Sequence, residues 1–518
     1  MKEIFEKFRD ALGRFLPNIG KYPVLKVMLL IFLVWLIIYI PNAISSSYGE
    51  REDRYTFYPE EAAPWNQTDK NYDVTTEPIS IENATGDRFV KNIEETDSTM
   101  EFNWTAHNYT SSHHIGRINV HYELDGDEGL IRLKNVYRND TTRSWAAEKT
   151  FKREGNLTYY YTLEKNDISV FHRRTSVLLE GKNIYEEVRT GPPPLIHFYF
   201  IPPTLFTVAP EYGGAYLSFT LYFSLFVLFD ALLIFSTFRK YGQSKAFLMS
   251  MLFLVNPITI SNTHQDEAIV AFTIIIPLMY LIKKRDKTSS IFTGLSIPVK
   301  IWGGFIFPLY LLKKEYTWKR RFAYLVSAGS ISVAIFLFFY YLWGANSVWF
   351  LSQYSGTTEA MNLGPLSFWG RWWGVFSTAT KYPPRIPILL FVGISELAIF
   401  YIAYKREWPP LMTLASFLCL FFGLYIKVHW DYYLILFPFI LYFSVRDRRL
   451  FFSFIGLVST IYLMMIFASA PFDVSKLLMA FLNTTVVVIL LYHVYLFITD
   501  EKFSEIEKKE IWKRGFDS

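Results

Sequence analysis

The sequence predicts a polytopic α-helical membrane protein of about 10 full spans and a broken two-helix hairpin, with a β-rich extracytoplasmic domain inserted after the first span. Two observations predict this fold class. Apolar runs, each roughly long enough to cross the ~30 Å hydrocarbon core of a bilayer, fill most of residues 205 to 498. Residues 41 to 190, in contrast, are polar and charged. The chain therefore combines a membrane part with one large polar insertion.

The composition also narrows the function classes. Of the 518 residues, 51% are hydrophobic and 19% are aromatic, and the formal net charge is +5. The lysines and arginines lie in short clusters between the predicted spans, so the net charge gives no indication of nucleic-acid binding, and we expect no nucleic-acid partner. The single cysteine, Cys419, lies inside an apolar run. A disulfide within the chain is impossible, so the polar region needs a core of its own.

The start of the chain predicts the orientation. Residues 1–23 are basic and amphipathic, and a first span follows at residues 24–40. The long polar leader and the lack of a small-residue cleavage pattern favour a retained anchor over a signal peptide. The positive-inside rule then places the leader in the cytoplasm and residues 41–195 outside. A multi-span membrane domain at 196–498 and a charged cytoplasmic tail at 499–518 complete the predicted organisation.

The polar insertion has the features of an external β-domain. The stretches RINVHYEL, GLIRLKNVYR, LTYYYTLEK and ISVFHRRTSVLLEG alternate like strands, and turn signals such as LDGDEG separate them. We read Asp125, Asp127 and Glu128 in LDGDEG as turn residues rather than as a cation loop. One Asn-X-Ser/Thr acceptor sequon, at Asn483, lies outside the insertion; it falls within a predicted span, and we interpret it as a chance occurrence. The insertion contains six Asn-X-Ser/Thr acceptor sequons, at Asn66, Asn83, Asn103, Asn108, Asn139 and Asn156. External glycosylation is the favoured interpretation of these six, and an Asn- and Thr-rich loop is the alternative.

Basic clusters between the spans give the rest of the topology, with one conflict. The clusters at 283–287 and 313–321 are separated by only about 25 residues, yet the positive-inside rule places both in the cytoplasm. Two short helices that enter and return resolve the conflict, with breaks at 298–300 and at 303–304. A lysine in lipid costs about 2.5–3.5 kcal/mol, so Lys300 should face a cavity. The alternative is one span with a tolerated basic loop outside.

With the hairpin in place, most ionisable residues at span ends that are not topology signals fall on the outer face. The stretch NTHQDEAIV adds His264 and Gln265 to this face. The ionisable residues are Asp266, Glu267, Lys300, Arg371, Lys427, His429 and Asp431. Acids and bases together at one membrane face suit a charged, membrane-bound substrate.

Several segments resemble one enzyme family. One segment is similar to the polyprenol-phosphate-sugar-dependent glycosyltransferases of the GT-C fold, in their mannosyltransferase-like branch. Its matching residues are Gln265, Asp266 or Glu267, KKR at 283–285, Gly294-Leu295 and Lys300. YGEREDRYTFYPE, GPPPLIHFYFIPPTLF and HWDYYLILFPFILYF resemble further segments of the same family. The sequence departs from the family in its insertion and in the histidine before Gln265. WWG at 372–374 lacks the acid of oligosaccharyltransferases, which argues against en bloc transfer to protein asparagine.

The resemblance implies transfer of a sugar from a polyprenyl or dolichyl phosphate to a hydroxyl of a lipid-linked glycan or surface glycoconjugate, with inversion. A general base must deprotonate that hydroxyl, and a cation must stabilise the leaving phosphate. Asp53 is the first choice for the base, with Glu52 and Glu50 as alternatives, although all three also suit a solvated linker. The residues expected to bind donor phosphate or acceptor are His264, Gln265, Asp266, Glu267, Lys300, Arg371, Lys427, His429 and Asp431.

For several of these residues a purely structural explanation is the alternative to a role in binding. A helix N-terminus alone favours the two acids at 266–267, an interfacial anchor would explain Arg371, and a polar turn would explain His429 with Asp431. A lipid monophosphate donor needs no bridging metal, so we expect no metal and no cofactor beyond the lipid-phosphate sugar. The expected partners are this donor, a glycan or glycolipid acceptor, and membrane lipid. The alternatives from other classes are a transporter or flippase and a surface receptor or adhesion protein.

Overall fold

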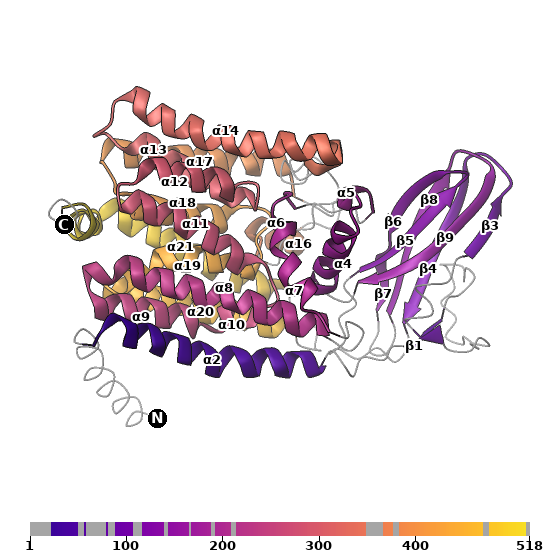
Figure 1. Ribbon diagram of the computed structural model, residues 1–518, viewed down its shortest axis with the longest axis horizontal. Helices are drawn as coiled ribbons and strands as arrows, with labels where there is room; N and C mark the ends of the chain where they lie inside the picture. Colours follow the sequence, from indigo (N-terminus) through magenta and orange to yellow (C-terminus); the bar gives the residue numbers. More distant parts are fainter. Residues whose placement is uncertain are drawn as a thin grey trace. The chain divides into compact units, whose positions relative to one another are not determined.

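The computed structural model divides the chain into two compact units (Figure 1). The helical unit comprises Met1–Ile44, Val177–Phe206 and Leu217–Ser518, and the second unit comprises Ser45–Ser176 and Thr207–Tyr216. The structure describes residues 22–49, 56–58, 79–80, 89–106, 117–138, 143–164, 167–187, 192–208, 214–348, 366–376, 383–469 and 476–513.

Long apolar helices dominate the helical unit. The helices long and apolar enough to cross a membrane are α2 (Val24–Gly49), α8 (Gly214–Phe238), α14 (Trp318–Trp343), α17 (Arg385–Lys405), α20 (Arg448–Ser469) and α21 (Lys476–Thr499). The shorter apolar helices are α11 (Glu267–Ile282), η3 (Ile301–Ile306) with α13 (Phe307–Leu312), α18 (Pro410–Leu424), and η5 (Trp430–Tyr432) with α19 (Tyr433–Ser444). These helices confirm the prediction of a multi-pass helical membrane protein. The number of full spans and the sidedness stay predictions.

The apolar helices differ in how much of their surface the protein covers. Helices α18 and α19 are buried along almost their whole length, including Cys419. In contrast, only 17% of the most apolar window of α14 and 22% of that of α17 are buried. A helix that is apolar on every side needs either protein or lipid around it. Helices α18 and α19 therefore form the centre of the bundle, and α14 and α17 present apolar surface outward.

The segment between the two conflicting basic clusters folds back on itself. Helix α12 (Asp286–Ser296) runs up to a turn, and η3 and α13 return beside it. The Tyr310 hydroxyl of α13 lies 2.7 Å from the Ser289 hydroxyl and 2.9 Å from the Thr293 hydroxyl of α12. At the base, the Lys313 ammonium is paired with the Asp286 carboxylate. Both basic clusters therefore lie at the same end of the hairpin, as the interpretation of two short helices requires.

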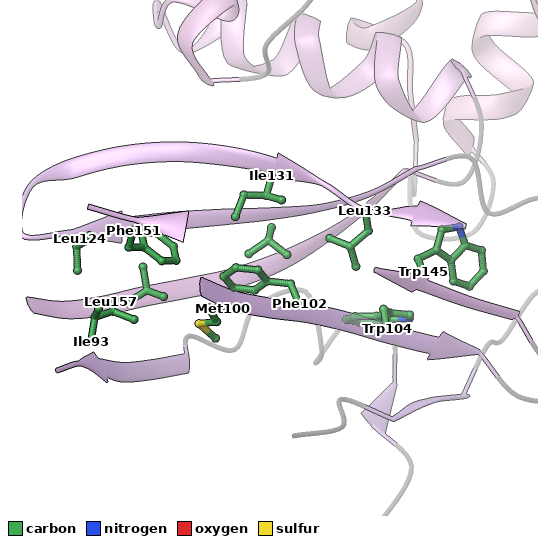
Figure 2. Close-up of a cluster of buried hydrophobic side chains, with 11 residues drawn as sticks. Ile93, Met100, Phe102, Trp104, Leu124, Ile131, Leu133, Trp145, Phe151 and Leu157 are labelled. Atoms are coloured by element: carbon green, nitrogen blue, oxygen red, sulfur yellow. The ribbon is translucent and has the colours of Figure 1, made fainter. Parts of the chain in front are cut away.

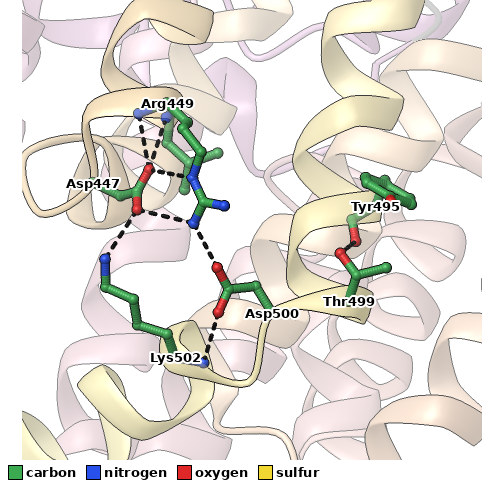
Figure 3. Close-up of polar contacts among 7 residues, drawn as sticks. Asp447, Arg449, Tyr495, Thr499, Asp500 and Lys502 are labelled. Atoms are coloured by element: carbon green, nitrogen blue, oxygen red, sulfur yellow. Dashed lines mark hydrogen bonds and ion pairs between the residues drawn. The ribbon is translucent and has the colours of Figure 1, made fainter.

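The last helices of the chain cover the ends of earlier ones. Glu507 of α22 (Lys502–Glu507) accepts hydrogen bonds from the backbone N–H groups of Leu411 and Met412, both at 2.9 Å. These two groups belong to the first turn of α18, which has no intrahelical partners for them. Beside this contact, Arg449 is paired with Asp447 and Asp500, and Lys502 is paired with Asp447 (Figure 3). The C-terminal segment thus supplies hydrogen-bond partners for the first turn of α18.

The remaining helices are short connecting elements or parts of the helical unit. They are α4 (Asp167–Leu179), α5 (Ile184–Glu187), α6 (Ile196–Tyr199), α7 (Ile201–Leu205), η2 (Arg239–Tyr241), α9 (Gln243–Leu254), α10 (Pro257–Ser261), η4 (Ala345–Val348), α16 (Phe368–Phe376) and η6 (Lys508–Lys513).

The second unit contains two antiparallel sheets, which supports the predicted β-rich domain. The sheet orders are β2-β1-β4-β8-β7 and β3-β9-β5-β6. The strands are β1 (Thr56–Tyr58), β2 (Ile79–Ser80), β3 (Phe89–Ile93), β4 (Ser98–Ala106), β5 (Arg117–Leu124), β6 (Asp127–Arg132), β7 (Lys134–Arg138), β8 (Arg143–Phe151) and β9 (Gly155–Glu164). Alternate residues of β4, namely Met100, Phe102 and Trp104, enter a core that the other strands complete (Figure 2).

The turn between β5 and β6 is the tight hairpin that LDGDEG predicts. Leu124 pairs with Asp127, which leaves Asp125 and Gly126 as the two loop residues. Both have positive φ angles, 47° and 83°, as this class of two-residue hairpin requires. Of the sequons, Asn103 lies half-buried on β4 and Asn156 lies exposed on β9. Asn66, Asn83, Asn108 and Asn139 lie outside the described residues.

One predicted strand is wrong. The stretch ISVFHRRTSVLLEG, expected to be extended, forms α4. Its β-branched residues favoured a strand, but Asp167 supplies a carboxylate to the first helical turn, where negative charge is favourable. Ile168, Phe171 and Thr175 are buried and recur at helical spacing, so the burial follows a helical period. Tertiary packing thus outweighed the local preference for a strand.

Candidate functional site

The Lys300 side chain binds two carboxylates that lie far from it in sequence. Its ammonium group donates a hydrogen bond to Asp266 Oδ1 at 3.1 Å and another to Glu267 Oε1. All three residues are buried, with exposed fractions of 8% for Lys300, 7% for Asp266 and 1% for Glu267. An unpaired buried charge would cost several kcal/mol, so this pairing is what allows the three groups to remain in an apolar region.

The two acids stand at the beginning of α11. Asp266 is the residue before the helix, and its backbone carbonyl accepts the N–H of Val270. Its side chain makes no capping hydrogen bond to the helix, and Glu267 occupies the first turn. Carboxylates in this position gain about 0.3–1 kcal/mol from the helix dipole. The helix start thus explains why acids are tolerated here, and the free side-chain oxygens explain how they reach Lys300.

The turn of the hairpin sets the position of Lys300. The Ser296 carbonyl accepts the N–H groups of Val299 and Lys300, both at 3.1 Å, and Lys300 itself is extended. A Cβ on Gly303 would lie 2.0 Å from the Ser296 hydroxyl, so the chain can return this closely only at a glycine. The Leu195 N–H binds the Pro298 carbonyl at 3.0 Å, which ties the turn to the segment before α6.

A third acid joins the cluster from the other side. Asp431 of η5 is 8% exposed, and its charge interacts with that of Glu267. The neighbouring Tyr432 ring lies below the Lys300 ammonium, 5.4 Å from nitrogen to ring centre. Within the described part of the chain, Glu267 Oε2 and Asp431 Oδ1 are buried and accept no hydrogen bond. The cluster therefore has one ammonium, three carboxyl groups and unused acceptor capacity.

Neutral polar groups that the sequence analysis missed lie beside these acids. Asn262 is fully buried, and neither atom of its side-chain amide has a hydrogen-bond partner among the described residues. Thr259 lies one turn earlier, in α10. Its hydroxyl is also buried and has no hydrogen-bond partner among the described residues. Helix α10 packs against η5, which carries Asp431. The signal in the sequence was the run NPITISNT, in which polar residues recur at helical spacing within an apolar segment.

Basic residues predicted for the site lie along one linked segment. The Leu366 N–H binds the Val428 carbonyl at 3.0 Å, and the Trp369 indole binds the Leu424 carbonyl at 2.7 Å. These bonds hold α16, which carries Arg371, against the turn that carries Lys427 and His429. The three basic side chains are half-buried and contact other groups.

The structure thus gathers part of the predicted set. Asp266, Glu267, Lys300 and Asp431 form one cluster, and the half-buried His264 and Gln265 precede it directly. Lys300 was expected as a phosphate-binding cation, but its ammonium is engaged by carboxylates. The expected bases Asp53, Glu52 and Glu50 lie outside the described residues. In the described ranges, no three His, Cys, Asp or Glu residues are arranged to hold a metal ion, and the prediction of a metal-free reaction stays a prediction.

No protein-family model matches the chain, and no curated protein matches it. The resemblance to the GT-C glycosyltransferases therefore stays an interpretation of the sequence motifs.

Proposed function

We propose that the protein is a membrane glycosyltransferase of the GT-C type, which moves a monosaccharide from a polyprenyl or dolichyl phosphate to a hydroxyl of a lipid-linked glycan or surface glycoconjugate at the outer face. The observation that supports this proposal best is the buried cluster of Lys300, Asp266, Glu267 and Asp431, with its unused carboxylate oxygens. Such oxygens in an apolar setting call for a hydroxyl or a proton as partner.

The cluster suits general-base catalysis with inversion. As the acceptor oxygen attacks the anomeric carbon, its proton passes to a carboxylate, and the bond from that carbon to the phosphate oxygen breaks. The electron pair of the broken bond stays with the lipid phosphate. Glu267 Oε2 and Asp431 Oδ1 accept no hydrogen bond from the described residues and therefore have lone pairs for the proton. The Lys300 ammonium is hydrogen-bonded to Glu267 Oε1 and Asp266 Oδ1. Asp53 remains the alternative base.

The charges of the residues around the cluster suggest which of them bind the phosphate and which bind the sugar. An acidic cluster repels a phosphate, so the leaving group belongs with the cationic side chains of Arg371 and Lys427 and with the imidazole of His429. The neutral groups of Asn262 and Thr259 supply donors and acceptors of the kind that sugar hydroxyls need. Acceptor and sugar would thus contact the acids and amides, and the lipid phosphate would contact the segment from α16 to η5.

One observation favours a transporter as the second candidate. Asp230, within α8, is fully buried, and neither of its carboxylate oxygens has a hydrogen-bond partner among the described residues. Acids inside membrane-spanning helices often belong to ion or proton pathways. An ion-coupled transporter or flippase would use Asp230, whereas glycosyl transfer as proposed does not.

The test uses purified full-length protein, a panel of radiolabelled dolichyl-phosphate monosaccharides and extracted lipid acceptors. Wild-type protein should transfer one of the sugars, Glu267→Gln and Lys300→Ala should lose the activity, and the exposed Glu407→Gln should retain it. Loss in Asp53→Asn with retention in Glu267→Gln would move the base to Asp53. Solute uptake into proteoliposomes without any transfer, lost in Asp230→Asn, would replace the transferase with the transporter.

A further inference from the structure

The basic cluster before and within the start of α14 contains a lysine, Lys319, for which the described residues provide no ion pair or hydrogen bond. Residues 313–321 include five basic side chains and one acid. Lys313 is paired with Asp286, Lys314 is paired with Glu407 at 3.0 Å, and Arg320 donates to the Tyr324 hydroxyl at 3.0 Å. Arg321 donates to two backbone carbonyl groups. Lys319 is exposed and makes no ion pair or hydrogen bond with the described residues.

Lys319 borders a shallow apolar cavity that lies open to the outside along one face of α14. The cavity has a volume of about 530 Å³ and is lined by Trp318, Lys319, Phe322, Ala323 and Val326. Trp318, Phe322 and Val326 follow one another at successive turns of α14, with exposed fractions of 59%, 57% and 49%. The small side chain of Ala323 leaves the hollow open between them. The cavity therefore has an apolar wall that runs along the helix, and the Lys319 ammonium group lies at the end of the cavity where the helix begins.

The wall of this cavity is held in place although it is exposed. The Arg321 guanidinium lies over the Trp318 ring, 4.8 Å from its centre, and the Tyr404 ring of α17 lies 6.4 Å from it between ring centres. Tyr404 in turn lies below the Lys314 ammonium, at 4.9 Å. Cation–π contacts of this kind fix an aromatic ring whose outer face remains free. The indole is thus positioned before any ligand binds.

We propose that this cavity binds an anionic phospholipid. An acyl chain would lie along Trp318, Phe322 and Val326, and the phosphate headgroup would pair with Lys319. Helix α14 is long and apolar enough to cross a membrane, and the cavity lies at its first two to three turns. A tryptophan beside a lysine at that level is typical of the boundary between headgroups and acyl chains. The ammonium of Lys319 favours a negative headgroup over a neutral one. This site is independent of the proposed glycosyl transfer.

The test counts lipids retained by the full-length protein in native mass spectrometry, during titration with phosphatidylglycerol or phosphatidylcholine. Wild-type protein should retain a phosphatidylglycerol molecule more tightly than a phosphatidylcholine molecule. Lys319→Gln should weaken phosphatidylglycerol binding about fivefold, since one basic residue contributes about that factor near a membrane surface. Ala323→Phe should abolish the tight binding by filling the cavity. Circular dichroism and a melting curve should show that both variants fold.

Arg448→Gln is the matched control, because Arg448 is an exposed basic residue at the start of α20 and does not line the cavity. It should leave phosphatidylglycerol binding unchanged. Equal retention of the two lipids by wild-type protein would overturn the proposal, and so would equal losses in Lys319→Gln and Arg448→Gln. A second copy of the chain found on this face, in place of lipid, would overturn it as well.

Discussion

Two buried lysines on one hairpin have opposite surroundings. At the base, Lys313 is 5% exposed and pairs with Asp286, whose other oxygen accepts a hydrogen bond from the Tyr316 hydroxyl. At the tip, Lys300 is shared by Asp266 and Glu267, while oxygens of Glu267 and Asp431 stay without a hydrogen bond among the described residues. At the base of the hairpin, each carboxylate oxygen of Asp286 therefore has a donor. At the tip of the hairpin, the carboxylate oxygens outnumber the donors among the described residues.

This difference separates a structural contact from a site. Buried polar groups in folded proteins are nearly always satisfied, so an unsatisfied set calls for an explanation such as a ligand or water. The base needs none, since its charges and hydrogen bonds are complete. The tip is also where the backbone is irregular and where residues from α11, η3 and η5 meet. Changes at the base should therefore affect stability, and changes at the tip should affect activity.

The largest expected effect is on turnover at the tip. Glu267→Gln should lower sugar transfer by about 10²–10⁴-fold, because the amide cannot accept the proton that a general base accepts. The quantity to measure is the rate of sugar transfer per folded molecule. Asp286→Asn, at the base of the hairpin, is the matched variant. Asp286→Asn should retain its rate. A comparable loss of rate in both variants would contradict the division between tip and base.

The second effect is on stability at the base. Lys313→Met should lower the free energy of unfolding by about 3–5 kcal/mol, because it leaves the buried Asp286 charge without its cation. Denaturant titration in detergent micelles measures this difference. The double variant Lys313→Met/Asp286→Asn should recover part of the loss. If the single variant unfolds at the wild-type denaturant concentration, the base is not the structural contact described here.

A smaller loss should follow from the removal of one hydroxyl group. Tyr316→Phe should lower the free energy of unfolding by about 1.5–3 kcal/mol, since the hydroxyl donates to the Asp286 carboxylate. Tyr324→Phe is its control, because the partner of the Tyr324 hydroxyl among the described residues is the exposed Arg320, from which it accepts a hydrogen bond. The same titration should show almost no change for this control. Equal effects of the two variants would count against the special role of Asp286.

The smallest effect concerns the ion pairs of Asp447 (Figure 3). Burial acts to raise the pKa of Asp447, but hydrogen bonds from Arg449 and Lys502 outweigh it and lower this pKa to about 2. Because the folded pKa lies below the unfolded one, the contribution to stability is complete above about pH 5 and is lost as the pH falls toward 2. After allowance for solvent screening we expect about 1 kcal/mol.

The difference in melting temperature between wild type and Asp447→Asn measures this contribution. It should be constant from pH 7 down to about pH 5 and should close toward pH 2. A difference that grows as the pH falls would have the wrong sign for a carboxylate with a lowered pKa.

Parts of the fold and of the site were predictable because charge is costly in a membrane. The conflict between the clusters at 283–287 and 313–321 predicted a hairpin, and the polar residues at span ends predicted Asp266, Glu267, Lys300 and Asp431 as site residues. The pairing of Lys300 with the two acids depends on how α11 packs beside the hairpin, which no local pattern specifies. Sequence alone therefore predicted residues that the structure brings together, but not the pairing of Lys300 with the two acids, and the role of Lys300 in binding stays a prediction.

Other features depend on contacts between distant parts of the chain. Glu507 binds the first turn of α18 from 95 and 96 residues away, so the sequence near either partner gives no signal. Asn262 was missed because the polar residues of NPITISNT also suit a turn between two helices, and their burial depends on packing against distant segments. The strand expected in place of α4 shows the opposite case, in which a local preference was clear and packing overrode it.

The close packing of α12 against α14 has a consequence for how the protein is made. A Cβ on Gly294 would lie 2.7 Å from the Ala328 carbonyl oxygen, and the Ser332 hydroxyl binds the Gly294 carbonyl at 2.9 Å. Helix α12 has only 11 residues, several of them polar, so it is too short and too polar to partition into a bilayer by itself. Stable insertion of the hairpin in the bilayer should therefore depend on its contact with α14.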